Sequence, residues 1–272
     1  MINRYFRFPG GKAKVLSFSY DDGVEQDIRL IDIFRQHGLK GTFNLNSGLF
    51  GRQDKHRRMT EEEVKQVYTT DVCEVACHGA HHGTLAILDP AIAALDVLDD
   101  RRNLERLFER QIHGLAYANG SVNETVDSIC RNAGIWYGRT VKSTKDFYLP
   151  ENWLHMHPTC HHNNAMLPEL TDRFMALKPV KSPQMFLVWG HAYQFDDQKN
   201  WDVMERFADR IAGQDDIWYA TNMEVYLAWR DFKRLEYSVD GSMVYNPNPR
   251  SVWVFQPQVG TYEIKPGELL RR

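Results

Sequence analysis

Two adjacent acidic residues, Asp21 and Asp22, follow the apolar run at residues 15–20 and precede Gly23. The run predicts a buried strand, and α/β proteins build their sites at the carboxyl ends of parallel strands. Neighbouring carboxylates repel each other, and a bound cation or a proton relieves that repulsion. The pair therefore predicts a metal site, with a simple Asp-Asp-Gly turn as the alternative.

Two histidines, His78 and His82, come directly after the strand-like segment 73–77 (CEVAC). If the loop coils into a helical turn, both imidazoles reach one cation. With one carboxylate they suit a borderline divalent ion such as zinc, and three protein ligands leave positions open for water and substrate. His81 is offset by one residue, so we expect it to point elsewhere, either supporting the metal ligands from behind or lining the pocket.

A further histidine, His191, ends the apolar segment 185–191 (MFLVWGH). A histidine at this place can change its protonation near neutral pH. The alternative is a hydrogen-bonded structural histidine at a strand end.

The elements that must position these side chains alternate along the chain. Short apolar runs predict strands at 15–20, 41–45, 73–77, 112–117, 135–141, 185–191 and 217–221. Helical periodicity predicts helices between them, including 25–37, 169–177, 201–212 and 222–233. Repeated strand–helix units imply a parallel sheet, open or closed into a barrel.

Helix starts and faces carry their own signals. Capping boxes are expected at residues 60–63 and 121–124, and Asp89 before Pro90 is a typical helix start. Two sets of apolar residues are predicted to face inward. They are Ile28, Ile31 and Phe34 in the first helix, and Leu95, Leu98, Leu104, Leu107 and Phe108 in the helix after Pro90.

The tail differs from the rest of the chain. From residue 236 the apolar pattern alternates with a period of two, and turn signals occur at 240–241 and 247–249. We therefore predict a barrel at 1–235 and a small antiparallel β appendage at 236–272.

Composition narrows the function classes. The 272 residues include 33 basic and 36 acidic side chains, a net charge of −3, so neither a nucleic-acid nor a membrane partner is expected. The chain shows no signal-peptide run, which predicts a cytoplasmic protein. The four cysteines are expected to be reduced and structural.

In order and spacing, these segments resemble the polysaccharide deacetylase family, the NodB homology domain of carbohydrate esterase family 4. Its first motif, Thr-Phe-Asp-Asp-Gly, is similar to residues 19–23 (SYDDG), and its His-(Ser/Thr)-x-x-His motif to 78–82 (HGAHH). The third motif falls at 115–120 and the fifth at His191. The resemblance covers about 12–230 and implies an irregular (β/α) barrel of about seven parallel strands.

The chemistry and the resemblance together imply a mechanism. Asp22, His78 and His82 would hold a divalent metal, expected to be zinc with cobalt or nickel as alternatives. Asp21 would act as general base and His191 as general acid. By resemblance, the backbone N–H of Asn119 would stabilise the oxyanion.

The sequence also departs from the family pattern. Ala116 replaces the arginine that commonly orients the catalytic aspartate, and Arg139 is a candidate substitute. The fourth motif has only a loose match at 151–153. The histidine-rich run 155–162 predicts the rim of the pocket, with a second metal site as the alternative.

Aromatic and imidazole side chains complete the expected site. Tyr117, Trp153, His161 and Tyr193 are candidates for binding substrate, whereas Trp189, inside an apolar strand, is expected in the core.

The predicted activity is metal-dependent removal of acetyl groups, from nitrogen or oxygen, of a sugar, oligosaccharide or polysaccharide. One alternative is a deformylase or a hydrolase of small cyclic amides on the same fold. The second is a sugar-binding protein without catalysis. The sequence leaves the oligomeric state and the role of the appendage open.

Overall fold

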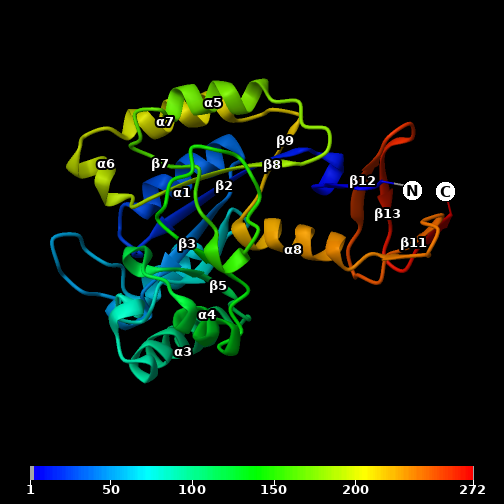
Figure 1. Cartoon of the computed structure of the whole chain (residues 1–272). Coiled ribbons are helices and arrows are strands. Elements are labelled where there is room, and N and C mark those ends of the chain that lie inside the picture. Colours follow the sequence, from blue (N-terminus) through cyan, green and yellow to red (C-terminus); the bar gives the residue numbers. More distant parts are fainter. Residues whose placement is uncertain (1–2, 272) are drawn as a thin grey trace.

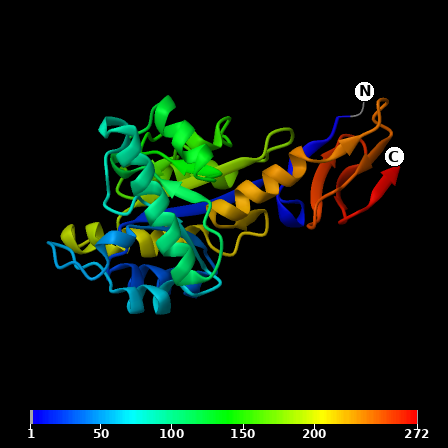
Figure 2. The ribbon, with the colours of Figure 1, turned by 90° about the horizontal axis from the view of Figure 1, so that it is seen from below.

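The computed structural model describes residues 3–271. Figure 1 shows a parallel sheet wrapped by helices and, beyond it, a smaller antiparallel region that contains both ends of the chain. Helix α8 (Asn222–Lys233) runs from the first part to the second. Turned by 90°, Figure 2 shows the same separation of the two parts.

The parallel sheet has the strand order β6-β5-β4-β3-β2-β8-β7, and β9 pairs with the N-terminal residues 14–16 of β2. Every pairing within it is parallel. This confirms the predicted barrel class. The strands are β2 (Lys14–Asp21), β3 (Gly41–Leu45), β4 (Cys73–Cys77), β5 (Gly114–Ala116), β6 (Tyr137–Arg139), β7 (Cys160–His161), β8 (Gln184–Gly190) and β9 (Ile217–Tyr219).

Helices cover the outer face of this sheet. They are α1 (Asp27–His37), α2 (Glu61–Tyr68), α3 (Pro90–Phe108), α4 (Glu124–Asn132), α5 (Leu167–Ala176), α6 (Tyr193–Asp197) and α7 (Trp201–Ile211). Within β2, which is buried throughout, Phe18 packs outward against Phe34 of α1 and Phe207 of α7, at ring separations of 4.5 and 5.8 Å. The alternate residues Ser17 and Ser19 face the inside of the barrel.

Local sequence signals explain most of the helix ends. Thr60 and Glu63 form the expected capping box, and Asp89 caps α3. Gly38 ends α1 in the left-handed conformation, with φ 65°. The second predicted capping box is wrong, because Asn123 caps α4 through the N–H of Val126.

Part of the predicted helix faces is also wrong. Ile28, Leu95 and Leu98 are 44%, 53% and 39% exposed. In α3 the inward positions are occupied instead by Asp96 and Asp100 as well as apolar residues. Apolar periodicity does not predict this face, because two of its buried positions are acidic residues that accept hydrogen bonds from the loop after β4.

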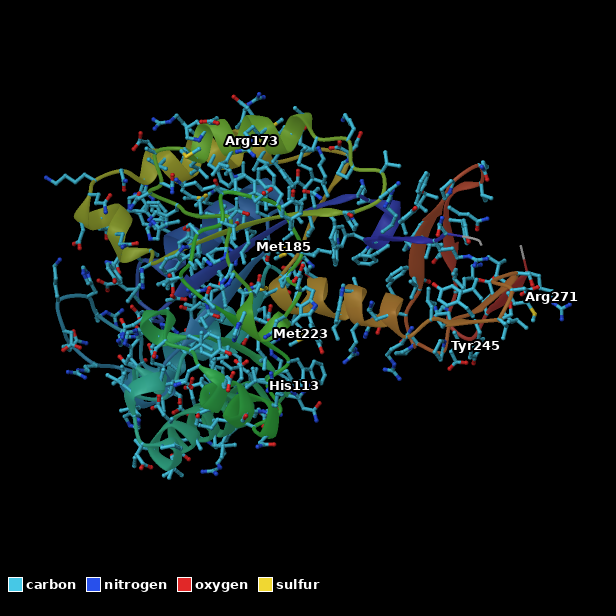
Figure 3. All side chains as sticks on the ribbon, in the orientation of Figure 1. His113, Arg173, Met185, Met223, Tyr245 and Arg271 are labelled. Carbon is cyan, nitrogen blue, oxygen red and sulfur yellow. The ribbon has the colours of Figure 1, made fainter. Side chains whose placement is uncertain are left out.

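The irregular stretch after β6 closes the barrel. Met156 pairs in parallel with Arg139 of β6, while Cys160 and His161 of β7 pair with β8. The start of α8 fills the opposite end of the barrel, where a second apolar cluster lies. Met185 of β8 and Met223 of α8, both labelled in Figure 3, belong to that cluster.

Two small antiparallel sheets form the C-terminal region. One contains β1 (Tyr5–Arg7), β12 (Val252–Gln256) and β13 (Gly260–Ile264). The other contains β10 (Glu236–Tyr237), β11 (Met243–Tyr245) and β14 (Leu269–Arg271). The N-terminal strand β1 thus pairs with the appendage, and the division into domains at residue 235 stays a prediction.

The four cysteines are free and buried. Among residues 3–271, no helix has both the length and the hydropathy needed to cross a bilayer.

Candidate active site

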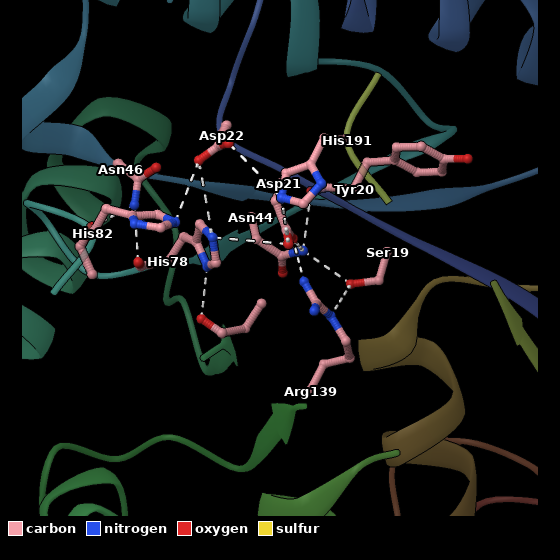
Figure 4. A network of polar contacts seen from close by, with 12 residues as sticks. Ser19, Tyr20, Asp21, Asp22, Asn44, Asn46, His78, His82, Arg139 and His191 are labelled. Atoms are coloured by element: carbon pink, nitrogen blue, oxygen red, sulfur yellow. Dashed lines mark hydrogen bonds and ion pairs between the residues drawn. The ribbon is translucent and has the colours of Figure 1, made fainter. Parts of the chain in front are cut away.

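Four strands carry polar residues to the same edge of the barrel (Figure 4). Asp21 ends β2 and is followed by Asp22, His78 follows β4, Arg139 ends β6 and His191 follows β8. Because the strands are parallel, residues far apart in the chain arrive at one carboxyl-terminal edge. This is the location expected for a site in an α/β barrel.

Asp22, His78 and His82 form a group whose ligand atoms all lie within 4.8 Å of one another. The Oδ1 atom of Asp22 is 3.8 Å from Nε2 of His82 and 4.0 Å from Nε2 of His78. Tetrahedral ligands with bonds near 2.0–2.1 Å are about 3.3 Å apart, so small side-chain rotations would let the group hold an ion. Two imidazole nitrogens and one carboxylate oxygen suit zinc.

The orientation of His78 supports this assignment. Its Nδ1 lies 2.8 Å from the Ala116 carbonyl oxygen and therefore carries the proton and donates it. Nε2, directed towards the aspartates, is buried and has no hydrogen-bond partner among the described residues. Burial lowers the pKa of His78, which favours the neutral, metal-binding form.

Asp21 is held differently from its neighbour. Its Oδ1 accepts hydrogen bonds from Arg139 and from the Asn44 side chain, the latter at 2.8 Å. Burial raises the pKa of Asp21, but Arg139, His78 and His191 outweigh it and lower the value to about 2. Oδ2 remains on the side of the histidines, 3.8 Å from the Nε2 atoms of both His78 and His191.

His191 faces the carboxylate pair from the side opposite His82 (Figure 4). Its Nε2 is 3.8 Å from Asp21 Oδ2 and 3.9 Å from Asp22 Oδ2. The side chain is 19% exposed, so it can be reached from solvent. It is thus placed to exchange a proton with a molecule bound beside the aspartates.

Two buried acids of α3, which sequence reasoning missed, hold the loop that carries His78 and His81. Asp100 accepts hydrogen bonds from the backbone N–H groups of His78 and Ser47, both at 2.8 Å. Asp96 accepts from the backbone N–H and the imidazole of His81. Their spacing of four residues on one helix face was the available signal.

Arg58 and Asn44 were also missed. The guanidinium of Arg58 donates hydrogen bonds to the carboxylate and to the backbone carbonyl of Asp22. Asn44 links Ser19 to Asp21. Nothing in the polar loop around Arg58 distinguishes this arginine from its neighbours in the sequence.

The structure does not bring Tyr117 and Trp153 to the site. Tyr117 lies just beyond the end of β5 and is fully buried beneath the outer helices, because its side chain joins the same outward-facing cluster as Leu115. Trp153 is 5% exposed and packs against Tyr226 and Trp229. Both aromatic rings are core residues, and the expectation that they bind substrate is corrected.

His161 and Tyr193 do lie beside the site. Burial lowers the pKa of His161 to about 4, with a further contribution from His191. The ring of Tyr193 is 5.1 Å from that of His191 and stacks on His56 at 4.0 Å. Trp189 was expected in the core. It is half-buried instead and faces the inside of the barrel, where its ring lies 4.7 Å from the guanidinium of Arg139.

Asn119 lies three residues beyond Ala116, whose carbonyl binds His78. Its backbone is left-handed, with φ 56°, and its side-chain amide donates to Thr84 Oγ1 at 2.9 Å. The proposed oxyanion role of its N–H stays a prediction.

The histidine-rich run 155–162 is divided among separate partners. His155 pairs with Asp127, His157 contacts Thr140, and His162 contacts Tyr20. Across residues 3–271, no group containing these histidines has three metal-ligand atoms close together.

The chain is similar to known proteins both in sequence and in fold. Residues 4–138 match the family model for polysaccharide deacetylase. Similar solved structures include the PuuE allantoinase, at 13% identity and TM-score 0.64 over 82% of this chain and 92% of that one. A Mycobacterium smegmatis protein assigned to the polysaccharide deacetylases matches at 14% identity and TM-score 0.61, over 86% and 96% of the two chains.

A family 4 carbohydrate esterase from Streptomyces lividans, solved with acetate, matches at 15% identity and TM-score 0.52, over 75% of this chain and 90% of that one. The chain spans only 55%, 58% and 44% of the length of three other matched structures. No curated protein sequence matches it. At these identities the structural similarities establish the fold.

Proposed function

The chain belongs to the polysaccharide deacetylase family, and we propose that it is a divalent-metal hydrolase that removes acetyl groups from an acetylated carbohydrate. One observation carries the metal dependence. The buried Nε2 of His78 has no hydrogen-bond partner among the described residues. It faces Asp22 Oδ1 at 4.0 Å, and Nε2 of His82 lies 3.8 Å from the same oxygen. Leaving such a nitrogen unsatisfied costs about 1–3 kcal/mol, which metal coordination would remove.

In this proposal, Asp22, His78 and His82 hold the ion, which we infer to be zinc, with cobalt or nickel as alternatives. The ion would supply Lewis-acid polarisation of the acyl carbonyl and of a water molecule. Nδ1–H of His78 donates to the Ala116 carbonyl, which keeps Nε2 available as the ligand atom.

The protons are moved by residues that flank this group. Asp21, ionised because its pKa is about 2, accepts the proton of the attacking water on Oδ2, while Arg139 and Asn44 hold Oδ1. His191 donates a proton to the leaving nitrogen or oxygen through Nε2. Both groups converge on one point, since Oδ2 and Nε2 are 3.8 Å apart.

The surroundings of the site suggest how substrate is held. His161, Tyr193 and Trp189 lie around His191 and are all partly exposed, and aromatic ring faces of this kind can stack on a sugar. The backbone N–H of Asn119 is the proposed donor to the developing oxyanion.

The direct test is release of acetate from acetylated substrates: chito-oligosaccharides, xylo-oligosaccharides and single N-acetyl sugars. Each is assayed with zinc, cobalt or nickel and after chelation, and wild type is compared with Asp21→Asn. We expect metal-dependent release that falls by about 10²–10⁴-fold in the variant, the range that a positioned base contributes. The variant should still bind metal.

The same assay separates the rival functions. If metal is bound but no acetate is released, the acetyl assignment is wrong. Hydrolysis of formylated sugars or small cyclic amides would then support the first rival, and binding of sugar without turnover would support the second.

A further inference from the structure

Arg58 contacts the proposed metal ligand Asp22 in two places. Its Nη2 donates to Asp22 Oδ1 at 3.0 Å, and its Nη1 donates to the Asp22 backbone carbonyl. Nη1 also donates to Asn46 Oδ1 at 2.8 Å. The side chain is 14% exposed, so its guanidinium is largely withdrawn from water.

The backbone around Arg58 fixes this contact. Residues 57–59 run antiparallel to residues 23–25, with a bridge between Val24 and Arg58 and a hydrogen bond from the N–H of Met59 to the carbonyl of Gly23. The loop is therefore tied to the chain immediately after Asp22. The pairing fixes the main chain of Arg58 beside Asp22, and the side-chain hydrogen bonds then hold the guanidinium in place.

Asp22 needs such support for two physical reasons. Its backbone has φ 88°, a left-handed conformation that costs a non-glycine residue about 1–3 kcal/mol. Its carboxylate also adjoins that of Asp21, and the like charges repel. Arg139 binds Asp21 and Arg58 binds Asp22, so each carboxylate has its own guanidinium.

We propose that Arg58 is a positioning residue that holds the Asp22 carboxylate in its metal-binding orientation before the metal arrives. The inference rests on the proposed function, because it takes Asp22 as a ligand. Oδ1, the atom that Arg58 binds, is also the Asp22 oxygen nearest to His82, at 3.8 Å, and it lies 4.0 Å from His78. A carboxylate oxygen can accept a hydrogen bond and bind a cation at once, and such outer partners orient ligands.

A guanidinium close to a metal site also repels the cation, which would weaken binding. Arg58 contacts both the carboxylate and the backbone of Asp22, a strained residue. We therefore take the stabilisation of the Asp22 orientation to be larger than the repulsion of the cation. We expect loss of Arg58 to weaken metal binding.

The neighbouring Arg57 provides a matched control. Its side chain also forms ion pairs, with Glu25 at 2.7 Å and Glu63 at 2.8 Å, and within residues 3–271 its side-chain hydrogen bonds and ion pairs go to these two acids and not to the site. The experiment measures the zinc dissociation constant by competition with a chromophoric chelator for wild type, Arg58→Ala, Arg58→Lys and Arg57→Ala. Thermal unfolding of the metal-free proteins shows that each variant is folded.

We expect Arg58→Ala to weaken zinc binding by about 10–100-fold, as the loss of an outer-shell partner does. Arg58→Lys should recover only part of this, because one ammonium group cannot reproduce the forked contact with Asp22 and Asn46. Arg57→Ala should bind zinc like wild type. At saturating zinc, Arg58→Ala should regain most of its kcat with an unchanged KM, because the residue does not contact substrate.

Unchanged or tighter zinc binding in Arg58→Ala would overturn the proposal. Full recovery in Arg58→Lys would overturn the positioning role in favour of charge alone. If wild type itself bound no zinc, the proposed metal site would fail before any variant was compared, which separates that failure from a failure of Arg58.

Discussion

The two ends of the barrel interior both contain acidic side chains, but the groups that surround these acids differ in kind. At the end filled by α8, both oxygens of Glu74 are hydrogen-bonded by neutral donors. Oε2 accepts from Thr42 Oγ1 and from the backbone N–H of Met223, both at 2.8 Å, and Oε1 accepts from Tyr137. The network is closed and helps to fix the start of α8.

At the carboxyl-terminal end of the strands, the acids are paired with arginines and lie beside an imidazole nitrogen without a hydrogen-bond partner among the described residues. Asp21 and Asp22 are bound by Arg139 and Arg58, and Nε2 of His78 has no partner among the described residues. Backbone strain also occurs here, at Asp22 with φ 88° and at His82 with φ 58°. A satisfied polar network stabilises a fold, whereas an incomplete and strained one is typical of a binding or catalytic site.

The largest expected effect comes from His78→Ala. The substitution removes a proposed ligand atom, so zinc affinity should fall by more than the roughly 10–100-fold that loss of an outer partner costs. Acetate release should fall with it. Equilibrium dialysis with zinc measures the first and the acetate assay the second, with His113→Ala, at the opposite ends of the strands, as control. Retention of tight zinc binding would remove His78 from the ligand set.

Arg139→Lys should have the next largest effect, on turnover and not on metal binding. Lysine keeps the charge but loses the forked contact with Asp21 and Ser19, so kcat should fall by about 10²-fold, the lower end of what a positioned base contributes. Zinc affinity should stay close to that of wild type. An equal fall in both quantities would show that Arg139 supports the metal ligands instead.

The same variant should change the pH profile. Burial raises the pKa of Asp21, and Arg139 is the first of the groups that lower it to about 2. A weaker Arg139 contact therefore raises the pKa of Asp21 and moves the acid limb of kcat/KM to higher pH. An unmoved acid limb would assign it to another group.

The smallest effect on activity is expected from Glu74→Gln, at the closed end. The amide nitrogen faces donors, so hydrogen bonds are lost and the free energy of unfolding should fall by about 1–3 kcal/mol. Zinc affinity and kcat should not change. Chemical denaturation measures this, and Glu62→Gln on the exposed side of α2 is the matched surface control.

Glu74 also gives a pH dependence with a definite sign. Burial raises its pKa in the folded protein. The folded state then holds a proton that the unfolded chain has lost, so this group's contribution is present below the ordinary glutamate pKa and is lost as pH rises through the folded pKa. Glu74→Gln should flatten that part of the stability curve. A variant curve parallel to that of wild type would contradict the assignment.

The sequence by itself determined the strand order along the chain and the residues at the strand ends. Segments 41–45 and 73–77 match β3 and β4 residue for residue, and Asp21, Asp22, His78, His82 and His191 gather as the spacing predicted. These signals are local, since apolar runs, caps and the placement of polar residues just after strands act over a few residues. The parallel sheet then brings such ends together.

Only the tertiary structure decided which other side chains reach the site. Tyr117 and Trp153 lie in the core, and Trp189 lies beside Arg139. Closure of the barrel determines which face of each strand is the inner one, and this cannot be read from the sequence. Arg58, Asp96 and Asp100 came to the site from a loop and a helix that no motif marks. Their contacts join residues distant in sequence, and local periodicity carries no information about such pairs.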